Sequence, residues 1–395
     1  MPFFLLTVLN AIFDISFGWL GPPGGFLVTL GLLSPLKTLN FQFLTLLAPG
    51  TGLRPSPKAC TGRGEEHYGG MFTRRRFLGL IPALGAAKSF AAASGKVPTR
   101  AFGRHAEQVS VVGLGGHTLA LSKDIPEATR IAHEAVDRGI TFFDNAWDYH
   151  GGRAEEWMGK ALEGIRDKTF LMTKVCTHQK PLPEGGKEGA MKMLEDSLRR
   201  LKTDRIDLWM LHEMKTEDEV KKFYGPGGAA EAFDLAKKQG KVRYLGFTGH
   251  DEPGVHLKMI EGGYPFDASL QPVSALGTLH SRRFESEVIP ALAKAKIAVI
   301  GMKGFGGSKR AHEKGLMNAE KVVRYALSYP EVCTHLIGVD QFDYVGDAAL
   351  AATKSPMTVD ERKTFAAWCD QMGGAAYAMH AQPGHRDGGC CGSVA

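Results

Sequence analysis

From residue 108 onward, short runs of β-branched and apolar residues alternate with longer stretches whose apolar positions recur at helical spacing. A run of about four to eight such residues between glycines or polar residues is typical of a buried strand. These runs predict eight strands, at residues 109–115, 140–146, 169–175, 206–212, 242–249, 266–271, 297–303 and 334–340.

The intervening stretches predict helices near residues 126–138, 153–165, 187–202, 228–239, 253–262, 284–295, 318–328 and 341–353. Eight strand-helix repeats within about 245 residues favour an α/β fold, a closed (β/α)8 TIM barrel, because parallel strands need crossover helices and this length is typical. A doubly wound open sheet is the alternative. It needs a glycine-rich phosphate turn after its first strand, and "GLGGHTLAL" from Gly113 lacks the G-x-G-x-x-G spacing.

The first fifty residues are apolar and nearly uncharged, unlike the rest of the chain. Asp14, the "GPPGG" turn and "SPLK" around Pro35 interrupt the two hydrophobic runs of this region. A spanning helix needs about 20 consecutive apolar residues, so neither run is a clean membrane span. We therefore expect no stable membrane crossing here.

The stretch "MFTRRRFLGLIPALGAAKSFAAASG" begins at Met71 with an arginine run, continues through a moderately apolar segment and ends in small residues. It resembles a twin-arginine export signal, because residues 73–78 read TRRRFL. The resemblance implies a periplasmic protein that uses the twin-arginine translocase as a partner. The alternatives are a basic anchor helix held in the inner membrane and a cytoplasmic protein.

Export signals are read at the amino terminus, which conflicts with the residues that precede Met71. We therefore expect Met71 to be the physiological initiator and residues 1–70 to be a non-native extension. The expected organisation is a signal and linker over 71–98, a barrel over 99–355, and a C-terminal helix with a flexible tail over 356–395.

Composition excludes several classes of protein. The 395 residues are 44% hydrophobic and 23% charged, which suits a large globular core. The net charge of +6 is modest and lies partly in the arginine run, so no nucleic-acid surface is indicated. The six cysteines form neither a disulfide pattern nor a zinc framework.

The tail predicts a helix over 358–372 followed by "HAQPGHRDGGCCGSVA". A soft-metal site is one interpretation, although the spacing of its candidate ligands is irregular: Cys369, His380, His385, Cys390 and Cys391. A flexible glycine-rich end is the simpler interpretation. We expect no metal site.

Polar residues end three successive predicted strands. Asp144 ends the second, Lys174 the third and His212 the fourth, and Tyr149 lies in the loop after the second. In such barrels the reacting groups lie at the carboxyl ends of the strands. Adjacent strands lie about 4.8 Å apart, so three neighbouring ends span roughly 10 Å. Each residue alone suits an ordinary structural role, but together the four are predicted to meet around one small group.

Each residue type has a physical task in that arrangement. An aspartate keeps a neighbouring ammonium charged and in place. A charged lysine about 4 Å from a phenol favours the phenolate by roughly 4 kcal/mol at an effective dielectric of about 20, enough for proton exchange near neutral pH. A histidine adds a second hydrogen bond to the reacting oxygen. This set favours carbonyl reduction by hydride from a nicotinamide.

The same residues carry a family resemblance. The chain resembles an aldo-keto reductase over roughly residues 99–355, through "RAFGRHAEQVSVVGLGG", "FFDNAWDYHGGRAEEWMGKAL", "MTKV", "DLWMLH", "GKVRYLGFTG" and "GMKGFGG". The resemblance implies a catalytic tetrad of Asp144, Tyr149, Lys174 and His212, the four reached from the strand ends. It also implies NAD(P)H as the cofactor.

Cofactor-binding residues follow from the resemblance. They are Thr248, Gly249 and Gln271 for the nicotinamide, then Lys303, Gly304, Phe305, Gly306, Gly307, Lys309 and Arg310 for the pyrophosphate, with Gly338, Val339 and Asp340 after the last strand. The family often has asparagine where Gly249 stands. Many members clamp a 2′-phosphate with basic residues after the last strand, but here the stretch carries acids, which favours NADH over NADPH or indicates weak cofactor binding.

The predicted substrate is a small carbonyl compound or a sugar. Trp147, His150 and His178 are the predicted pocket residues. A packing role is the ordinary alternative for Trp147, and pocket lining or plain solvation is the alternative for His150 and His178, as for His117 and His250. His150 replaces a glycine usual in the family. Two other functions stay open: a nicotinamide-binding redox sensor with little turnover, and a sugar-binding barrel without hydride chemistry.

Overall fold

The computed structural model describes residues 13–19, 26–32, 96–176 and 184–382. The chain divides into two compact units, Met1–Ala86 and Ala87–Ala395. In the first unit, β1 (Phe13–Trp19) and β2 (Phe26–Leu32) form an antiparallel hairpin. The twin-arginine motif lies outside the described residues. Among the described helices, none combines the length and apolar character needed to cross a membrane.

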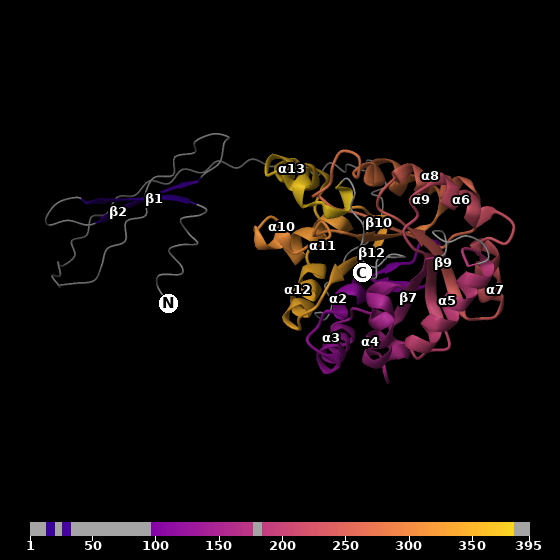
Figure 1. The fold of residues 1–395 in the computed structure, drawn as a ribbon. Helices are drawn as coiled ribbons and strands as arrows, with labels where there is room; N and C mark the ends of the chain where they lie inside the picture. Colours follow the sequence, from indigo (N-terminus) through magenta and orange to yellow (C-terminus); the bar gives the residue numbers. More distant parts are fainter. Residues whose placement is uncertain (1–12, 20–25, 33–95, 177–183, 383–395) are drawn as a thin grey trace, which may run out of the picture. The chain divides into compact units, whose positions relative to one another are not determined.

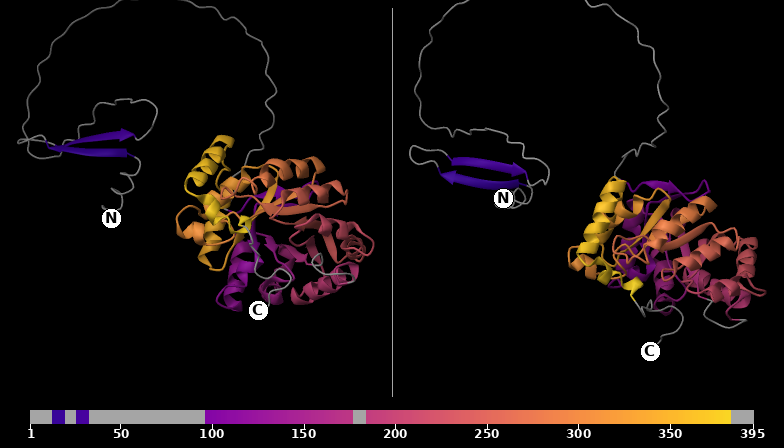
Figure 2. Two further views of the ribbon diagram at one scale, coloured as in Figure 1. Left: turned by 45° about the horizontal axis from the view of Figure 1, so that its top comes forward. Right: turned by 90° about the horizontal axis from the view of Figure 1, so that it is seen from above.

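Eight parallel strands of the second unit close into a barrel (Figure 1). They are β5 (Val112–Gly115), β6 (Phe142–Asp144), β7 (Phe170–Val175), β8 (Ile206–Leu211), β9 (Val242–Thr248), β10 (Ala268–Pro272), β11 (Ala298–Met302) and β12 (Val332–Gly338). The barrel closes where β12 pairs with β5, with Gly338 opposite Gly115. Helices surround the strands in both views of Figure 2, so the predicted (β/α)8 barrel is confirmed.

The main helices lie where the apolar spacing predicts them. They are α3 (Ile125–Asp137), α4 (Arg153–Ala161), α5 (Lys187–Arg200), α7 (Ala229–Lys238), α8 (Pro253–Glu261), α9 (Ile289–Ala295), α11 (Ala319–Leu327) and α12 (Asp343–Ala352). Three shorter helices were not predicted from the apolar spacing: α2 (Gly116–Leu119), α6 (Glu217–Tyr224) and α10 (Arg310–Glu313). A capping box starts α6, in which Thr216 and Glu219 each cap the other's backbone N–H.

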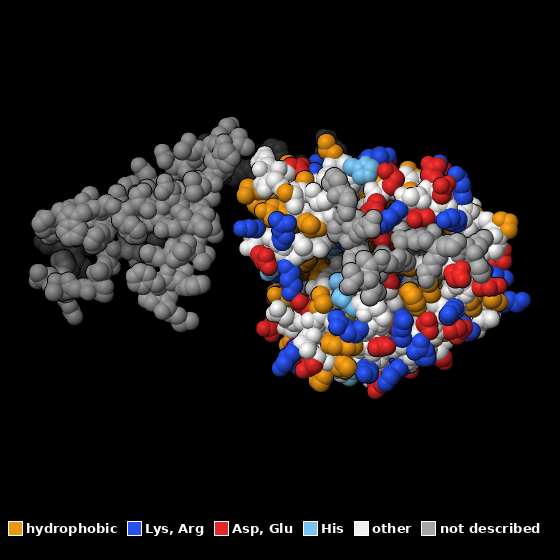
Figure 3. All heavy atoms as spheres, in the orientation of Figure 1, with side chains coloured by type: hydrophobic (Ala, Val, Ile, Leu, Met, Phe, Trp, Pro, Cys, Tyr) orange, Lys and Arg blue, Asp and Glu red, His pale blue; other side chains and the backbone are white. Residues whose placement is uncertain are grey.

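On the face shown in Figure 3, acidic and basic side chains of the described residues are interspersed. This mixture accords with the modest net charge of +6. A nucleic-acid-binding surface usually gathers lysine and arginine on one face. The face in view therefore has the character of an ordinary solvated surface.

A hairpin closes the amino end of the barrel. The strand expected over 109–115 divides at Val111, because β4 (Gln108–Ser110) pairs with β3 (Thr99–Ala101) and only β5 enters the barrel. The turn between β3 and β4 buries Phe102, whose ring lies 5.1 Å from the rings of both Phe170 and Tyr244. With this end filled by apolar side chains, the polar chemistry is left to the carboxyl ends of the strands.

The predicted C-terminal helix is present as α13 (Val359–Gln371). Two short turns follow it, η4 (Gly374–Tyr377) and η5 (Met379–Ala381). The Met379 N–H donates to the Gly306 carbonyl at 2.7 Å, so this part of the tail packs on the loop after β11. A flexible end was expected from its glycine content; residues 383–395 lie outside the described part of the chain.

Arg200, at the end of α5, holds the segment between β6 and α4. Its guanidinium donates to the Trp147 carbonyl at 2.8 Å and to Glu155 at 3.2 Å. Glu155 is fully buried and also accepts from the Thr173 hydroxyl at 2.6 Å. Gly152, with a φ of 97°, faces the same guanidinium, and a Cβ atom there would lie 2.5 Å from Arg200 Cζ. Glycine is therefore required at this position.

We expect Gly152→Ala to lower the free energy of unfolding by about 2–4 kcal/mol, because overpacking against Arg200 adds to a strained left-handed backbone. Gly151→Ala is the matched control. Gly151 also has a positive φ, of 66°, but no atom lies within 4 Å of its Cβ position. It should cost only about 1 kcal/mol. Urea denaturation followed by circular dichroism measures both, and equal losses would show that the Arg200 contact is not responsible.

Candidate active site

The ammonium of Lys174, on β7, is the centre of the site. Its Nζ donates to Asp144 Oδ1 at 2.5 Å, to the Asn145 carbonyl at 2.8 Å and to Tyr149 Oη at 3.1 Å. An ammonium has three donors, and these three acceptors account for them. Lys174 is only 1% exposed and Asp144 only 4%. The structure thus brings three of the four predicted catalytic residues into direct contact.

Burial dominates the electrostatics of the Asp144–Lys174 pair. Burial raises the pKa of the Asp144 carboxyl above its ordinary value, and the attraction of Lys174 opposes that rise. Removing one partner of a buried pair typically costs about 3–5 kcal/mol, because the other charge stays buried without its counter-ion. The two side chains therefore act as one structural unit.

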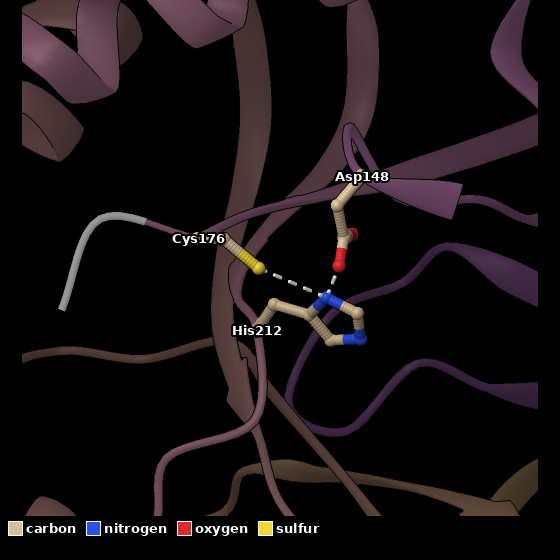
Figure 4. Close-up of side chains that lie close together, drawn as sticks. All are labelled: Asp148, Cys176 and His212. Atoms are coloured by element: carbon tan, nitrogen blue, oxygen red, sulfur yellow. Dashed lines mark hydrogen bonds and ion pairs between the residues drawn. The ribbon is translucent and has the colours of Figure 1, made fainter. Parts of the chain in front are cut away.

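His212, the residue after β8, is the fourth predicted catalytic residue. Its ring lies nearly perpendicular to that of Tyr149, with the centroids 5.3 Å apart. Nδ1 lies 3.0 Å from Asp148 Oδ1 and 3.3 Å from Cys176 Sγ (Figure 4). Nε2 points away from both partners in Figure 4. One ring nitrogen of His212 is thus anchored, while the other is directed elsewhere.

Asp148 and Cys176 are site residues that the sequence analysis did not identify. Asp148 directly precedes Tyr149, and Cys176 lies two residues after Lys174. In the sequence Asp148 has the character of a turn residue, and Cys176 is an isolated thiol. Both are buried, at 5% and 0% exposure. Their nearness in the chain to two predicted catalytic residues is the signal that could have found them.

Two histidines border Tyr149. The His117 ring lies 5.2 Å from the Tyr149 ring and 4.3 Å from the ring of His150. His150 Nε2 lies 2.9 Å from the His117 carbonyl oxygen. The φ of His150 is 53°, a left-handed conformation that glycine adopts without strain. His150, a predicted pocket residue, thus belongs to the surroundings of Tyr149.

The other two predicted pocket residues are placed differently. Trp147 is half-buried, and the Arg200 guanidinium lies 5.2 Å from its ring. The Trp147 N–H donates to the Lys174 carbonyl at 3.0 Å, which ties the loop to β7. A role for Trp147 in the substrate pocket stays a prediction. His178 lies outside the described residues.

Gln271, on β10, has the character expected of a residue that binds a carboxamide. It is fully buried, and its Oε1 accepts from the Ser269 hydroxyl at 2.9 Å. Its Nε2 makes no hydrogen bond with any described residue. A buried donor without a partner is costly. The carboxamide oxygen of a nicotinamide would satisfy it, so the residue fits the predicted cofactor.

The turn after β9 explains why residue 249 is glycine. The carbonyl of Thr248 accepts from the Met214 N–H at 2.7 Å, which brings the Met214 backbone close to the turn. A Cβ atom at Gly249 would lie 2.6 Å from the Met214 carbonyl oxygen. An asparagine side chain does not fit there, so only the backbone of Gly249 is available to a cofactor.

The loop at 303–307 is closely packed on both sides. Lys303 and Gly306 have φ values of 62° and 76°. A Cβ atom at Gly304 would lie 2.6 Å from His335 Nε2, and one at Gly306 would lie 2.1 Å from the Tyr377 carbonyl oxygen. Glycine is therefore required where the loop meets β12 and where it meets the tail. Left-handed residues of this kind turn backbone N–H groups toward a bound anion.

A basic and an acidic residue assigned to cofactor binding are paired with each other. Lys309 Nζ lies 2.5 Å from Asp340 Oδ2. Beside Asp340, the Val339 N–H donates to the Thr118 hydroxyl at 3.0 Å, which fixes the end of β12 to α2. The adjacent Gly338 packs against the same threonine. The loops after β11 and β12 are thus joined by an ion pair.

Two groups of described residues could hold a metal ion: Asp148, Cys176 and His212, and Glu213, His250 and Asp251. In the second group His250 lies 2.7 Å from Asp251 and 3.3 Å from Glu213, and the Lys215 ammonium lies 2.8 Å from Glu213. Cys369 and His380 belong to neither group. The remaining tail ligands considered from the sequence lie outside the described residues.

Known proteins resemble the chain in sequence and in fold. The sequence profile of the Aldo/keto reductase family matches residues 111–321. The uncharacterized oxidoreductase YqkF of Bacillus subtilis (strain 168) is 27% identical over 295 residues, covering 65% of this chain and 92% of its own. Methylglyoxal reductase YeaE of Escherichia coli (strain K12) is 30% identical over 218 residues, covering 53% of this chain and 70% of its own.

A solved structure supports the same assignment. The holo form of an aldo-keto reductase from Bacillus halodurans is 26% identical, with a TM-score of 0.57, and covers 74% of this chain and 100% of its own. The family match spans more than half of the chain and includes Asp144, Tyr149, Lys174 and His212. The chain therefore belongs to the aldo/keto reductase family and is an NAD(P)-dependent oxidoreductase.

Proposed function

We propose that this protein reduces an aldehyde or ketone to an alcohol, or catalyses the reverse oxidation, with Tyr149 as general acid and base. The observation that carries the proposal is the 3.1 Å contact between Lys174 Nζ and Tyr149 Oη. A positive charge at that distance favours the phenolate by about 5 kcal/mol at an effective dielectric of about 20. Tyr149 can therefore give up its proton and regain it.

When bound, NAD(P)H supplies the hydride that adds to the carbonyl carbon. The residues of the chain handle the proton. Tyr149 transfers its hydroxyl proton to the carbonyl oxygen, which becomes the alcohol hydroxyl, and the resulting phenolate stays beside Lys174. His212 contributes a hydrogen bond to the same oxygen through Nε2 in the form that carries a proton on that nitrogen, and so orients the oxygen. A proton from solvent then restores Tyr149.

The proposed cofactor preference is NADH over NADPH. The pairing of Lys309 with Asp340 supports it, because this cation is already neutralised. Asp343 and Asp347 follow, with no basic residue between 338 and 350. Carboxylates repel a 2′-phosphate and accept hydrogen bonds from ribose hydroxyls.

The proposed substrate is a small carbonyl compound or a sugar. His117 and His150 beside Tyr149 offer polar contacts to oxygen-rich groups. The Escherichia coli relative is named a methylglyoxal reductase. Methylglyoxal is therefore a suitable first probe of turnover.

We expect Tyr149→Phe to lower kcat for methylglyoxal reduction by at least about 100-fold, because the proton donor is lost while the ring stays. Steady-state oxidation of NADH measures it. Tyr244→Phe is the matched control, since Tyr244 lies at the closed amino end of the barrel, and it should keep full turnover. Retained activity in Tyr149→Phe would contradict the proposal. A wild-type protein that binds NADH but turns over no reactive aldehyde would favour the redox-sensor alternative.

We expect Asp340→Asn to raise NADPH affinity about tenfold more than NADH affinity, because it frees the Lys309 ammonium and removes a carboxylate that repels phosphate. Parallel fluorescence titrations with NADH and NADPH give both dissociation constants. Asp360→Asn, on the exposed start of α13, is the matched control and should change neither. A wild-type preference for NADPH, or equal changes in the dissociation constants of the two cofactors, would contradict the proposal that these carboxylates select NADH.

The location of the protein is a separate part of the proposal. The motif TRRRFL at 73–78 and the apolar, small-residue segment behind it support export through the twin-arginine translocase to the periplasm. That route carries folded proteins, which suits an enzyme that acquires its cofactor inside the cell. The protein is then proposed to arrive with nicotinamide bound.

We expect the Arg74→Lys, Arg75→Lys double variant to stay in the cytoplasm of a bacterium that exports the wild-type chain, because the signal depends on the arginine pair. Cell fractionation with immunodetection measures the distribution. Arg130→Lys with Arg199→Lys is the control, since both are exposed arginines of the barrel and lie outside the motif. Export of the Arg74, Arg75 variant, or cytoplasmic retention of the wild type, would contradict the proposal.

A further inference from the structure

We propose that Asp148, Cys176 and His212 form a binding site for one zinc-like divalent cation at the carboxyl end of the barrel. The three donor atoms, Asp148 Oδ1, Cys176 Sγ and His212 Nδ1, all lie within 4.8 Å of one another. They come from the segment after β6, the end of β7 and the end of β8, which are neighbouring strands. The ligands are therefore held by the barrel itself.

Two of the three distances between the donor atoms are close to those of a zinc centre, and the third, between Asp148 Oδ1 and Cys176 Sγ, is within 4.8 Å. With zinc–nitrogen and zinc–oxygen bonds of about 2.05 Å and a zinc–sulfur bond of about 2.3 Å, tetrahedral angles give edges of about 3.4 Å and 3.6 Å. The observed nitrogen–oxygen and nitrogen–sulfur distances are 3.0 Å and 3.3 Å. An expansion of a few tenths of an ångström, within the reach of side-chain rotation, would bring these two distances to the values of a zinc centre.

The proton balance at His212 favours a cation. Asp148 and Cys176 approach the same ring nitrogen, which carries one proton or none (Figure 4). A protonated Nδ1 donates to the carboxylate and cannot accept from the thiol. An unprotonated Nδ1 accepts from the thiol and turns its lone pair toward the carboxylate. A divalent cation between the three atoms binds all three lone pairs at once.

The donor set indicates which ion the site takes. Thiolate and imidazole select borderline-soft ions such as Zn²⁺ and Co²⁺ over Mg²⁺ or Ca²⁺, which prefer oxygen ligands. The three residues are at most 5% exposed, so water competes weakly for the ligands. The second group, Glu213 with His250 and Asp251, lacks a thiolate and already contacts the Lys215 ammonium. The first group is therefore the better zinc site.

The ion would also fix the tautomer of His212. An imidazole that binds metal through Nδ1 keeps its proton on Nε2, and Nε2 points away from Asp148 and Cys176. The site thus holds His212 as a donor, in the role that the proposed carbonyl reduction gives it. Metal binding itself does not depend on that reaction, so the two proposals can fail separately.

Cobalt titration of the full-length chain tests the site. We expect one equivalent of Co²⁺ to produce a thiolate-to-cobalt charge-transfer absorption and the visible bands of tetrahedral cobalt, and Zn²⁺ to abolish both. Cys176→Ala should remove the charge-transfer absorption. Asp148→Asn, nearly isosteric, should keep it but weaken cobalt affinity at least about tenfold. Circular dichroism confirms that each variant is folded.

Cys333→Ala is the matched control, because Cys333 is also buried but donates to the Val299 carbonyl inside the barrel. It should leave the cobalt spectrum unchanged. A wild-type protein without the charge-transfer absorption would overturn the proposal. So would an absorption that survives in Cys176→Ala, since it would then arise from other thiols such as Cys390 and Cys391.

Discussion

The buried ammonium of Lys174 is the interaction on which the rest of the site depends. A charge with 1% exposure is tolerated only when it is paired and hydrogen-bonded. Its acceptors, Asp144, the Asn145 carbonyl and Tyr149, all belong to the chain that leaves the neighbouring strand β6. Satisfying the ammonium therefore fixes the path of that chain. The hydrogen bonds that stabilise the buried charge of Lys174 also place the phenol of Tyr149 beside that charge.

The segment after β6 is held from its outer side as well. There Arg200 binds the Trp147 carbonyl and Glu155, and it packs on a glycine at 152 that leaves room for the guanidinium. Lys174 on β7 and Arg200 on α5 thus both bind the segment 145–152, which joins β6 to α4. A misplacement of about 1 Å at a reacting group can cost about 100-fold in rate. The contacts of Lys174 and Arg200 therefore fix the position of Tyr149, although it lies in a loop and not in a strand.

Local patterns explain what could be predicted and what could not. The strands and main helices follow from apolar spacing, and the tetrad follows from polar residues at three successive strand ends. The division of one expected strand at Val111 has only a slight local signal, because a single polar residue, Ser110, interrupts the apolar run there. Asp148 and Cys176 were missed for a related reason: their relation to His212 exists only across strands. The pairing of Lys309 with Asp340 likewise joins two loops.

The loop at 303–307, which is predicted to bind the pyrophosphate, is fixed by neighbours that carry no positive charge. His335, packed behind Gly304, is fully buried, and burial lowers the pKa of its imidazole to about 3, so it is neutral at physiological pH. On the other side, the tail donates the Met379 N–H to the Gly306 carbonyl. Both neighbours fix the backbone without adding a cation. Backbone N–H groups oriented by a loop of this shape are suited to phosphate, in line with the cofactor preference proposed above.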